Sequence, residues 1–307
     1  MTCAFTLPPT MRVFERGWLS SNNILFTGPG ETALIDSGYK THAAQTLALV
    51  EQALGGRALQ RLINTHLHSD HCGGNAALQA RYPCLTLIPE AEAAKVQAWD
   101  EDALSYRATG QQCDRFEYDF TLAPGDALDL GGYAWQVLGA PGHDPHSLIF
   151  YCAMEGILIS ADALWQNGFG VIFPELEGES GFDEARATLA LIDTLDVRLV
   201  IPGHGAPFTD VKAALARACS RLDYLQADPV RNADNAVKVM LKFLLLERRQ
   251  LQLAALPALF QAIPVVERAR LRLLQKNPAE LAEWAVRALV RAGAARIDGE
   301  LLVNHDL

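Results

Sequence analysis

Three histidines and one aspartate lie within six positions of the sequence, at His66, His68, Asp70 and His71. Imidazole and carboxylate groups are the usual protein ligands of zinc and similar divalent metals. The side chains of His66 and His68 can point the same way and hold one metal, whereas Asp70 and His71 are offset and suit a second. The cluster therefore predicts a metal site for two ions.

The residues around this cluster indicate how it is positioned. Leu62 and Ile63 precede it in a short apolar run that is typical of a buried strand. Gly73 and Gly74 follow it and let the backbone turn tightly before a helix. A polar turn with chance histidines is the alternative, but 3 of the 8 histidines in the chain stand here. We therefore expect the ligands on a loop at the end of a strand.

The pattern His66-x-His68-x-Asp70-His71 resembles the HxHxDH signature of the metallo-β-lactamase superfamily. Further motifs that resemble those of the family occur in the family's order, over roughly residues 11 to 209. They are Asp36-Ser37-Gly38, Ala140-Pro141-Gly142-His143, Ser160-Ala161-Asp162 and Ile201-Pro202-Gly203-His204-Gly205. The resemblance implies the four-layer αβ/βα sandwich of that superfamily.

The resemblance also implies a dinuclear metal site, with zinc as the expected metal and Mn²⁺ or Fe²⁺ as alternatives. The expected ligands are His66, His68 and His143 for one ion, Asp70, His71 and His204 for the other, and Asp162 for both. A divalent ion lowers the pKa of bound water from about 15.7 to near 7, so a metal-bridging hydroxide would be the nucleophile. Asp70 is also expected to orient that hydroxide.

A site of this kind fits a hydrolase of an ester, thioester, lactone, amide or phosphodiester, and the fold does not choose among them. A small ester-like substrate is the first hypothesis. An RNA phosphodiesterase, or a non-catalytic nucleic-acid-binding regulator, is the alternative. Seven candidate ligands favour turnover, because a structural zinc site is normally closed by four. His68 argues against the diiron branch, which usually has Glu there, and the short motif around His204 argues against glyoxalase II.

The sequence departs from the family pattern at two positions shortly after His143. Asp144 stands where Thr is common, and His146 stands where a small residue is usual. His146 is expected to reach the substrate as a proton donor, and a hydrogen bond to an acid near the metals is the alternative. Four residues after Asp162 are expected to line the pocket, and the alternative is that the aromatic ones form core or dimer contacts. They are Trp165, Asn167, Phe169 and Phe173.

Apolar runs alternate with helical periodicity through most of the chain, as in a layered α/β protein. Strands are expected at residues 12–14, 23–27, 32–36, 84–88, 127–130, 133–138, 147–152, 156–160 and 198–201. Helices are expected from Thr41, which is expected to cap the first of them, over residues 75–82 and over residues 182–195. Residues 100–120 are irregular, and we expect either a lid or substrate wall, or an excursion that packs its own aromatic side chains.

The last third of the chain changes to helix. Residues 1–209 are predicted to form the catalytic domain and residues 210–307 a second, helical domain. The sequence Asn277-Pro278-Ala279-Glu280 predicts a capped helix start, and Asp298-Gly299 predicts a hairpin. A stripe of apolar residues is predicted to be buried: Val237, Met240, Leu241, Leu244 and Leu245. Helices followed by a small hairpin resemble the winged-helix module of one subgroup of the superfamily.

Charge is distributed unevenly along the chain. The formal net charge is -10, yet residues 231–297 hold 12 Lys and Arg against 5 Asp and Glu. Such a basic module is a candidate RNA-binding surface, a module that docks on an acidic partner in a homodimer, or a solvated helix face. The acidic body would repel a polyanion near the metals, which favours a small-molecule substrate.

Composition is that of a soluble globular protein, with 307 residues, 50% of them apolar and 20% charged. No apolar run approaches the roughly 18 residues of a membrane span, and the first five residues lack the features of a signal peptide. Six cysteines are scattered without CxxC spacing. We therefore expect a cytoplasmic protein with free thiols and no membrane partner.

Overall fold

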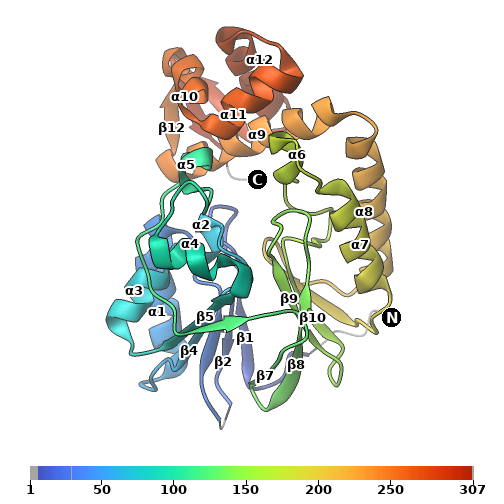
Figure 1. Ribbon diagram of the computed structural model, residues 1–307. Coiled ribbons are helices and arrows are strands. Elements are labelled where there is room, and N and C mark those ends of the chain that lie inside the picture. Colours follow the sequence, from blue (N-terminus) through green and yellow to red (C-terminus); the bar gives the residue numbers. More distant parts are fainter. Residues whose placement is uncertain (1–5, 29, 306–307) are drawn as a thin grey trace.

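Two β-sheets pack face to face in the computed structural model, which describes residues 6–28 and 30–305 (Figure 1). The first sheet has the order β1 (Met11–Phe14), β2 (Asn23–Phe26), β3 (Ala33–Ile35), β4 (Arg61–Ile63), β5 (Leu85–Pro89) and β6 (Phe120–Leu122). The second has the order β11 (Leu199–Pro202), β10 (Ile157–Ala161), β9 (Leu148–Cys152), β8 (Tyr133–Gly139) and β7 (Ala127–Leu130). Their inner faces share one apolar core, in which the rings of Phe26 and Trp135 meet edge to face at 5.5 Å.

Helices cover the outer face of each sheet and complete four layers. On the first sheet lie α1 (Ala43–Leu54) and α3 (Asn75–Arg81), which bury Val50 and Leu78 against Leu34. On the second lie α7 (Phe182–Asp193) and α8 (Val211–Gln226), which bury Leu189 and Leu222 in one cluster with strand residues. The predicted αβ/βα sandwich is confirmed, and the strand and helix predictions agree with these bounds to within a few residues.

Strand direction explains why the site forms where it does. Strands β3, β4 and β5 are mutually parallel, and β10 is parallel to β11. The carboxyl ends of parallel strands meet at the same edge of a sheet, and the loops that follow them carry function. Four short helices lie in such loops: α2 (Ser69–Cys72), α4 (Ala93–Ala98), α5 (Tyr106–Thr109) and α6 (Pro174–Glu177).

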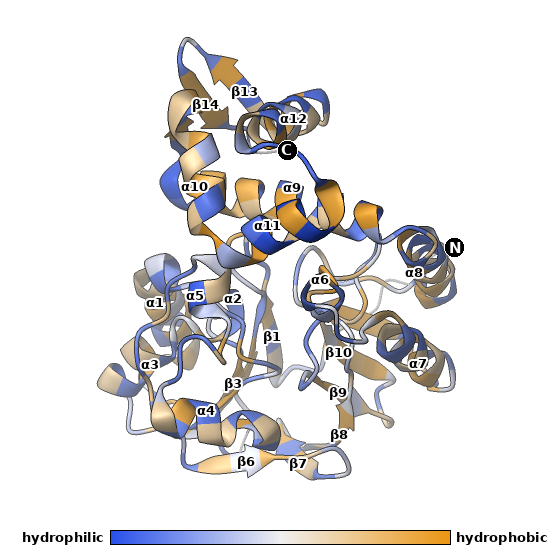
Figure 2. Ribbon diagram, turned by 45° about the horizontal axis from the view of Figure 1, so that its top comes forward, coloured by the Kyte–Doolittle hydropathy of each residue, from blue (hydrophilic) through white to orange (hydrophobic). Residues whose placement is uncertain are grey.

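The C-terminal helices sit above this edge of the sandwich (Figure 1). They are α9 (Pro229–Arg248), α10 (Leu256–Ala262), α11 (Pro264–Ala269) and α12 (Pro278–Arg291), and they pack beside a sheet of order β12 (Gln250–Gln252), β14 (Leu301–Asn304) and β13 (Ala295–Asp298). In Figure 2 these helices show one hydrophilic and one hydrophobic face. The predicted apolar stripe of α9 is buried in their common core, which also takes in Val171 and Leu176 from the sandwich.

Local predictions for this region are confirmed by hydrogen bonds. Asn277 and Glu280 form the reciprocal pair of a capping box at the start of α12. The antiparallel pair β13 and β14 turns at Gly299, as predicted. Helix α8 belongs to the predicted second domain, yet it packs on the sandwich. The division of the chain at residue 209 stays a prediction, as does the winged-helix assignment.

One cap prediction is wrong. Thr41 does not start α1, because residues 40–42 form a short 3₁₀ turn and the helix begins at Ala43 without a side-chain cap. The cysteines that the structure describes are all free, as predicted, and Cys3 lies outside the described residues. Among the described helices, none has both the length and the apolar character needed to cross a bilayer.

Candidate metal centre

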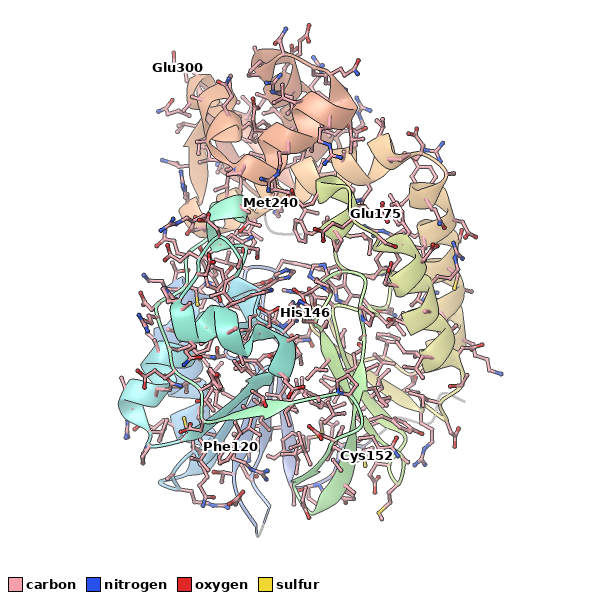
Figure 3. The ribbon with its side chains drawn as sticks, in the orientation of Figure 1. Phe120, His146, Cys152, Glu175, Met240 and Glu300 are labelled. Carbon is pink, nitrogen blue, oxygen red and sulfur yellow. The ribbon has the colours of Figure 1, made fainter. Side chains whose placement is uncertain are left out.

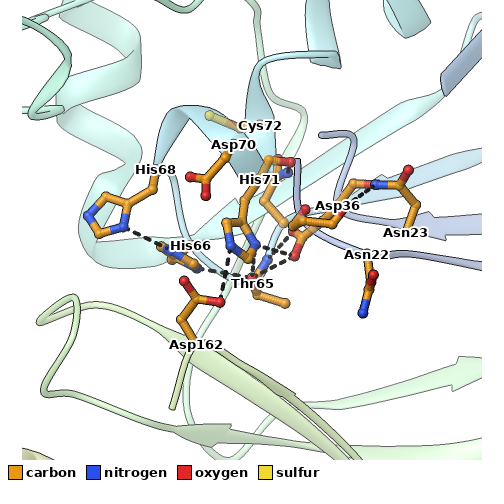
Figure 4. Close-up of polar contacts among 12 residues, drawn as sticks. Asn22, Asn23, Asp36, Thr65, His66, His68, Asp70, His71, Cys72 and Asp162 are labelled. Carbon is orange, nitrogen blue, oxygen red and sulfur yellow. Dashed lines mark hydrogen bonds and ion pairs between the residues drawn. The ribbon is translucent and has the colours of Figure 1, made fainter. Parts of the chain in front are cut away.

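Every predicted ligand lies in a loop or a short helix that follows a strand. His66 and His68 follow β4, and the turn of α2 carries Asp70 and His71. In the second half, His143 follows β8, Asp162 follows β10 and His204 follows β11. The structure therefore brings all seven side chains to one edge of the sandwich, where they form two groups. Figure 4 shows the part of this cluster around Asp36 and Thr65.

The first group contains His66, His68 and His143. The Nδ1 atom of His68 lies 3.1 Å from Nε2 of His66 and 2.8 Å from Nε2 of His143. Ligand nitrogens about 2.0–2.1 Å from a tetrahedral zinc lie roughly 3.3 Å apart. These three nitrogens are therefore spaced to bind one ion.

The second group contains Asp70, His71, Asp162 and His204. Nε2 of His204 lies 3.1 Å from Oδ2 of Asp70, and Nε2 of His71 lies 3.4 Å from Oδ1 of Asp162. The other oxygen of Asp162 lies 3.4 Å from Nε2 of His143, which belongs to the first group. Asp162 therefore stands between the groups, where a bridging ligand would be needed.

Two further observations test whether the residues fit metal ions. Nε2 of His71 is fully buried and has no hydrogen-bond partner in the part of the chain that the structure describes. A buried nitrogen of this kind costs free energy unless something binds it. At Gly203, any Cβ would overlap Oδ1 of Asp162, so that loop leaves the carboxylate its space. A donor set of imidazoles and carboxylates, in which a buried nitrogen 3.4 Å from Asp162 forms no hydrogen bond, fits divalent metals.

In three of the histidines, a hydrogen bond at Nδ1 leaves Nε2 as the ring nitrogen that faces the other ligand candidates. Nδ1 of His71 donates to Asp36 Oδ2 at 2.7 Å, and Nδ1 of His143 donates to the carbonyl of Val171 at 2.5 Å. Nδ1 of His66 lies 3.1 Å from Oγ1 of Thr65. In each case Nε2 keeps its lone pair for a metal, as ligand histidines require.

Asp36 was not assigned a role from the sequence, although its motif was noted. Besides His71, it accepts hydrogen bonds from the backbone N–H of Thr65 at 2.9 Å and from its hydroxyl at 2.8 Å (Figure 4). Its backbone has φ 57°, in the left-handed region that costs a non-glycine residue energy. Ala161 has φ 45° beside a register shift between β10 and β11, and it aims the next residue, Asp162, into the cluster.

Charges and burial set the protonation of the cluster. Burial, followed by the neighbouring histidines, lowers the pKa of His66, and burial and His68 lower the pKa of His143 to about 4. Burial raises the pKa of Asp162, but His71 and His204 more than offset this, so the pKa lies well below its usual value. Burial lowers the pKa of His71, but Asp162 and Asp36 more than offset this and raise it well above its usual value, so an ion at the second group would displace a proton from His71. His66 and His143 as neutral imidazoles and Asp162 as a carboxylate are already in the forms that bind metals.

Asp144 and His146 lie beside the first group. Oδ2 of Asp144 is 3.6 Å from Nε2 of His68, the far ring nitrogen of that ligand candidate. The other oxygen of Asp144 accepts the backbone N–H of His146 at 2.8 Å. The His146 ring is one-third exposed and lies 3.7 Å from Glu92, an acid that also binds Lys95. His146 is thus next to an acid, and whether it donates a proton stays a prediction.

A cavity opens beside both groups, and its walls are mainly aromatic and aliphatic. His204 is stacked under the indole of Trp18, with the ring planes 3° apart, and Trp165 meets its edge. Phe169 and Phe173 also line the cavity, as one of the two sequence hypotheses for this segment required. Helix α9 supplies the opposite wall through Val239, Met240 and Phe243. Figure 3 shows His146 between the halves of the sandwich and Met240 above it.

Residues 100–120 combine both expectations for that segment. Tyr106 and Phe116 pack with Trp99 in a small core of their own. Thr109 and Gln111 line the cavity beside the ligand candidates. The segment is therefore a packed excursion whose inner side forms part of the cavity wall.

Comparison with known proteins agrees with this geometry. The family model for the metallo-beta-lactamase superfamily matches residues 16–204. The metallo-beta-lactamase family protein TTHA1429 from Thermus thermophilus is structurally similar, with TM-score 0.59 and 19% identity over 98% of this chain and 100% of that chain. A beta-lactamase domain protein from Burkholderia ambifaria has TM-score 0.58 and 19% identity over 98% and 94%. Both likenesses show a shared fold that includes the C-terminal region.

The chain belongs to the metallo-β-lactamase superfamily, because the family model covers more than half of it. A hydroxyacylglutathione hydrolase from Rhodopseudomonas palustris (strain HaA2) is 31% identical over 144 residues, which are 47% of this chain and 47% of that protein. The chain thus matches about half the length of such curated relatives. That name is the other name of glyoxalase II, the branch that the motif around His204 disfavours.

Proposed function

We propose that this protein is a hydrolase that uses two divalent metal ions, zinc in the first instance, to cleave a small thioester or ester. The observation that carries the proposal is the pair of ligand groups, three nitrogens in one and four residues in the other, joined by Asp162. When bound, two such ions lower the pKa of water toward neutrality and polarise a carbonyl oxygen. Mn²⁺ and Fe²⁺ remain alternatives for the metal.

The residues of the chain then have separate tasks. Asp70, 3.1 Å from His204, is proposed to orient the attacking water as well as to bind metal. His146 is proposed to donate a proton to the leaving group from the side of Asp144. The aromatic wall at Trp18 and Trp165 is proposed to exclude bulk water, which strengthens the electrostatic interactions at the reacting carbonyl.

A thioester is the preferred substrate class for two reasons. Curated relatives that match about half of the chain are hydroxyacylglutathione hydrolases, whose name states a thioester substrate. The cavity is enclosed by helix α9 and by residues 100–120, which suits a small molecule. The short motif around His204 still places His204 in a ligand group, so it does not argue against thioester chemistry.

RNA cleavage is kept as the alternative, and the structure offers it little support. Several basic residues of the C-terminal region are paired within the chain: Arg268 with Glu177 at 2.5 Å, and Arg270 with Glu267 at 2.6 Å. We propose instead that residues 210–307, winged-helix-like in their elements, serve to enclose the cavity. A homodimer and a cytoplasmic location stay predictions.

The test is a turnover assay on zinc-loaded protein with S-lactoylglutathione, a simple aryl ester, a lactone and single-stranded RNA. We expect thioester hydrolysis that is lost on removal of the metal by a chelator and restored by added zinc. Cleavage of RNA without any ester or thioester turnover would support the alternative. A fully loaded protein that turns over none of the four would refute the proposal.

A further inference from the structure

A guanidinium group without an acidic partner lines the cavity beside the metal centre. Arg221, on helix α8, is half-buried and forms no hydrogen bond or ion pair with any residue that the structure describes. Its guanidinium carbon lies 5.4 Å from the ring centre of Phe169, in a cation–π contact. Burial lowers the pKa of Arg221 and no carboxylate offsets this effect. A half-buried guanidinium that lines a cavity and has no protein partner among the described residues is available to a ligand.

The loop that follows Asp162 contacts this guanidinium. A hydrogen bond of 2.7 Å from the N–H of Trp165 to the carbonyl of Gly168 closes the loop. Gly168 has φ 134°, a backbone conformation that favours glycine, and a Cβ there would lie 2.9 Å from Nη1 of Arg221, so the guanidinium lies close against this loop. The same loop carries the proposed bridging ligand and the stacking ring of Phe169. The guanidinium therefore lies close to the loop that connects it with the metal centre.

The other residues around the cavity leave its charge unneutralised. Arg221 is the one lysine or arginine among the described residues that line it, and the lining acids are Asp70 and Asp162, both candidate metal ligands. Asn235 lies on α9, and its buried amide nitrogen has no acceptor among the described residues. That amide can turn without breaking a hydrogen bond, so it can present either atom to a ligand.

We propose that Arg221 binds a carboxylate group of the substrate while the metal centre holds the bond to be cleaved, so that the substrate class is a carboxylate-bearing thioester or ester. One guanidinium and one neutral amide balance a single negative charge, which suits a carboxylate better than a phosphate dianion. The planar guanidinium matches a carboxylate with two parallel hydrogen bonds. This inference rests on the proposed function for the bond cleaved, but the anion site stands on its own geometry.

Straight-chain dicarboxylates from succinate to suberate test the proposal by binding, without turnover. One carboxylate can bind the metals and the other Arg221, and each diacid is compared with its ω-amide, which is neutral and of the same shape. Calorimetry on zinc-loaded protein should show one chain length at which the diacid binds about 10- to 100-fold tighter than the amide, as a charge-assisted hydrogen bond predicts.

Variants decide whether Arg221 causes the preference. Arg221→Met keeps most of the aliphatic stem and should bring diacid and amide to within about threefold of each other, because the charge is gone. Arg221→Lys should keep part of the preference. Lys212→Met is the matched control, since Lys212 lies on the same helix, is exposed and is not among the residues that line the cavity. It should behave as the wild type, and zinc content should be equal in all four proteins.

Two results would overturn the inference: no diacid preference at any chain length in the wild type, or a preference that survives in Arg221→Met. Both would mean that diacids bind through the metals alone. The outcome is separable from the proposed function. A diacid preference without thioester turnover would leave the anion site standing, and turnover without a diacid preference would remove the anion site and keep the hydrolase.

Discussion

Replacement of Asp36 by Asn should weaken metal binding although Asp36 is not a ligand. Asp36 is almost fully buried, and its two oxygens accept three hydrogen bonds, one from His71 and two from Thr65. An asparagine has the same shape but carries one oxygen and one NH₂ group. Whichever way the amide turns, its NH₂ meets either the N–H of Thr65 or the Nδ1–H of His71, and both are donors.

The expected size of the effect follows from that single mismatch. A buried donor left without an acceptor costs about 1–3 kcal/mol. The His71 ring can relieve the mismatch by rotating or by changing tautomer, and either change takes its Nε2 lone pair away from the group that contains Asp70, Asp162 and His204. The ion at this group should bind about 10- to 100-fold more weakly, which is the usual effect of losing such a partner.

A competition titration with a chromophoric zinc chelator resolves the two ions and measures this change. One affinity should fall in Asp36→Asn, and the ion held by His66, His68 and His143 should be less affected. Glu92→Gln is the control, because Glu92 is also a buried acid but bonds Lys95 and no predicted ligand. Two unchanged zinc affinities in Asp36→Asn would refute the role given to Asp36.

Two further predictions concern histidines. His146→Ala should lower turnover by about 10²–10⁴-fold with zinc content unchanged; an unaltered rate would show that His146 is no proton donor. The pKa of His143 is lowered to about 4, so the unfolded chain, with a pKa near 6.5, binds the proton first. In metal-free protein, the contribution of His143 to the free energy of unfolding is therefore complete above pH 6.5. It falls by about 3 kcal/mol as the pH is lowered from 6.5 to 4. Urea unfolding of wild type and His143→Gln at pH 4.5 and 7 measures it, and parallel profiles would contradict it.

The sequence was sufficient for the parts of the fold that depend on local pattern. The apolar runs and the helical stripe of α9 have the expected periodicity, and the capping residues at Asn277 and Glu280 act within four positions. The grouping of His66 with His143 followed from family resemblance, because nothing in residues so far apart in the chain gives their distance. The prediction that Thr41 caps the helix is wrong because Thr41 lies in a 3₁₀ turn that precedes the helix. The residue type alone does not predict that turn.

Contacts between segments that are far apart in the chain could not be predicted from the sequence. Asp144 was noted as a departure from the family pattern, but its position near the far nitrogen of His68 depends on how two loops from different sheets meet. No role for Arg221 could be predicted from the sequence, since an arginine on an amphipathic helix is usually solvated. Its lack of a partner is visible only once α8 is packed against the loop that holds Phe169.

The most direct test of the central claim is the metal content of the purified protein, measured by elemental analysis beside its hydrolytic activity. We expect about two divalent ions per chain in the wild type. Asp162 stands between both ligand groups, so Asp162→Ala should lose at least one ion and nearly all activity. Two ions and full activity in Asp162→Ala would contradict the dinuclear centre proposed here.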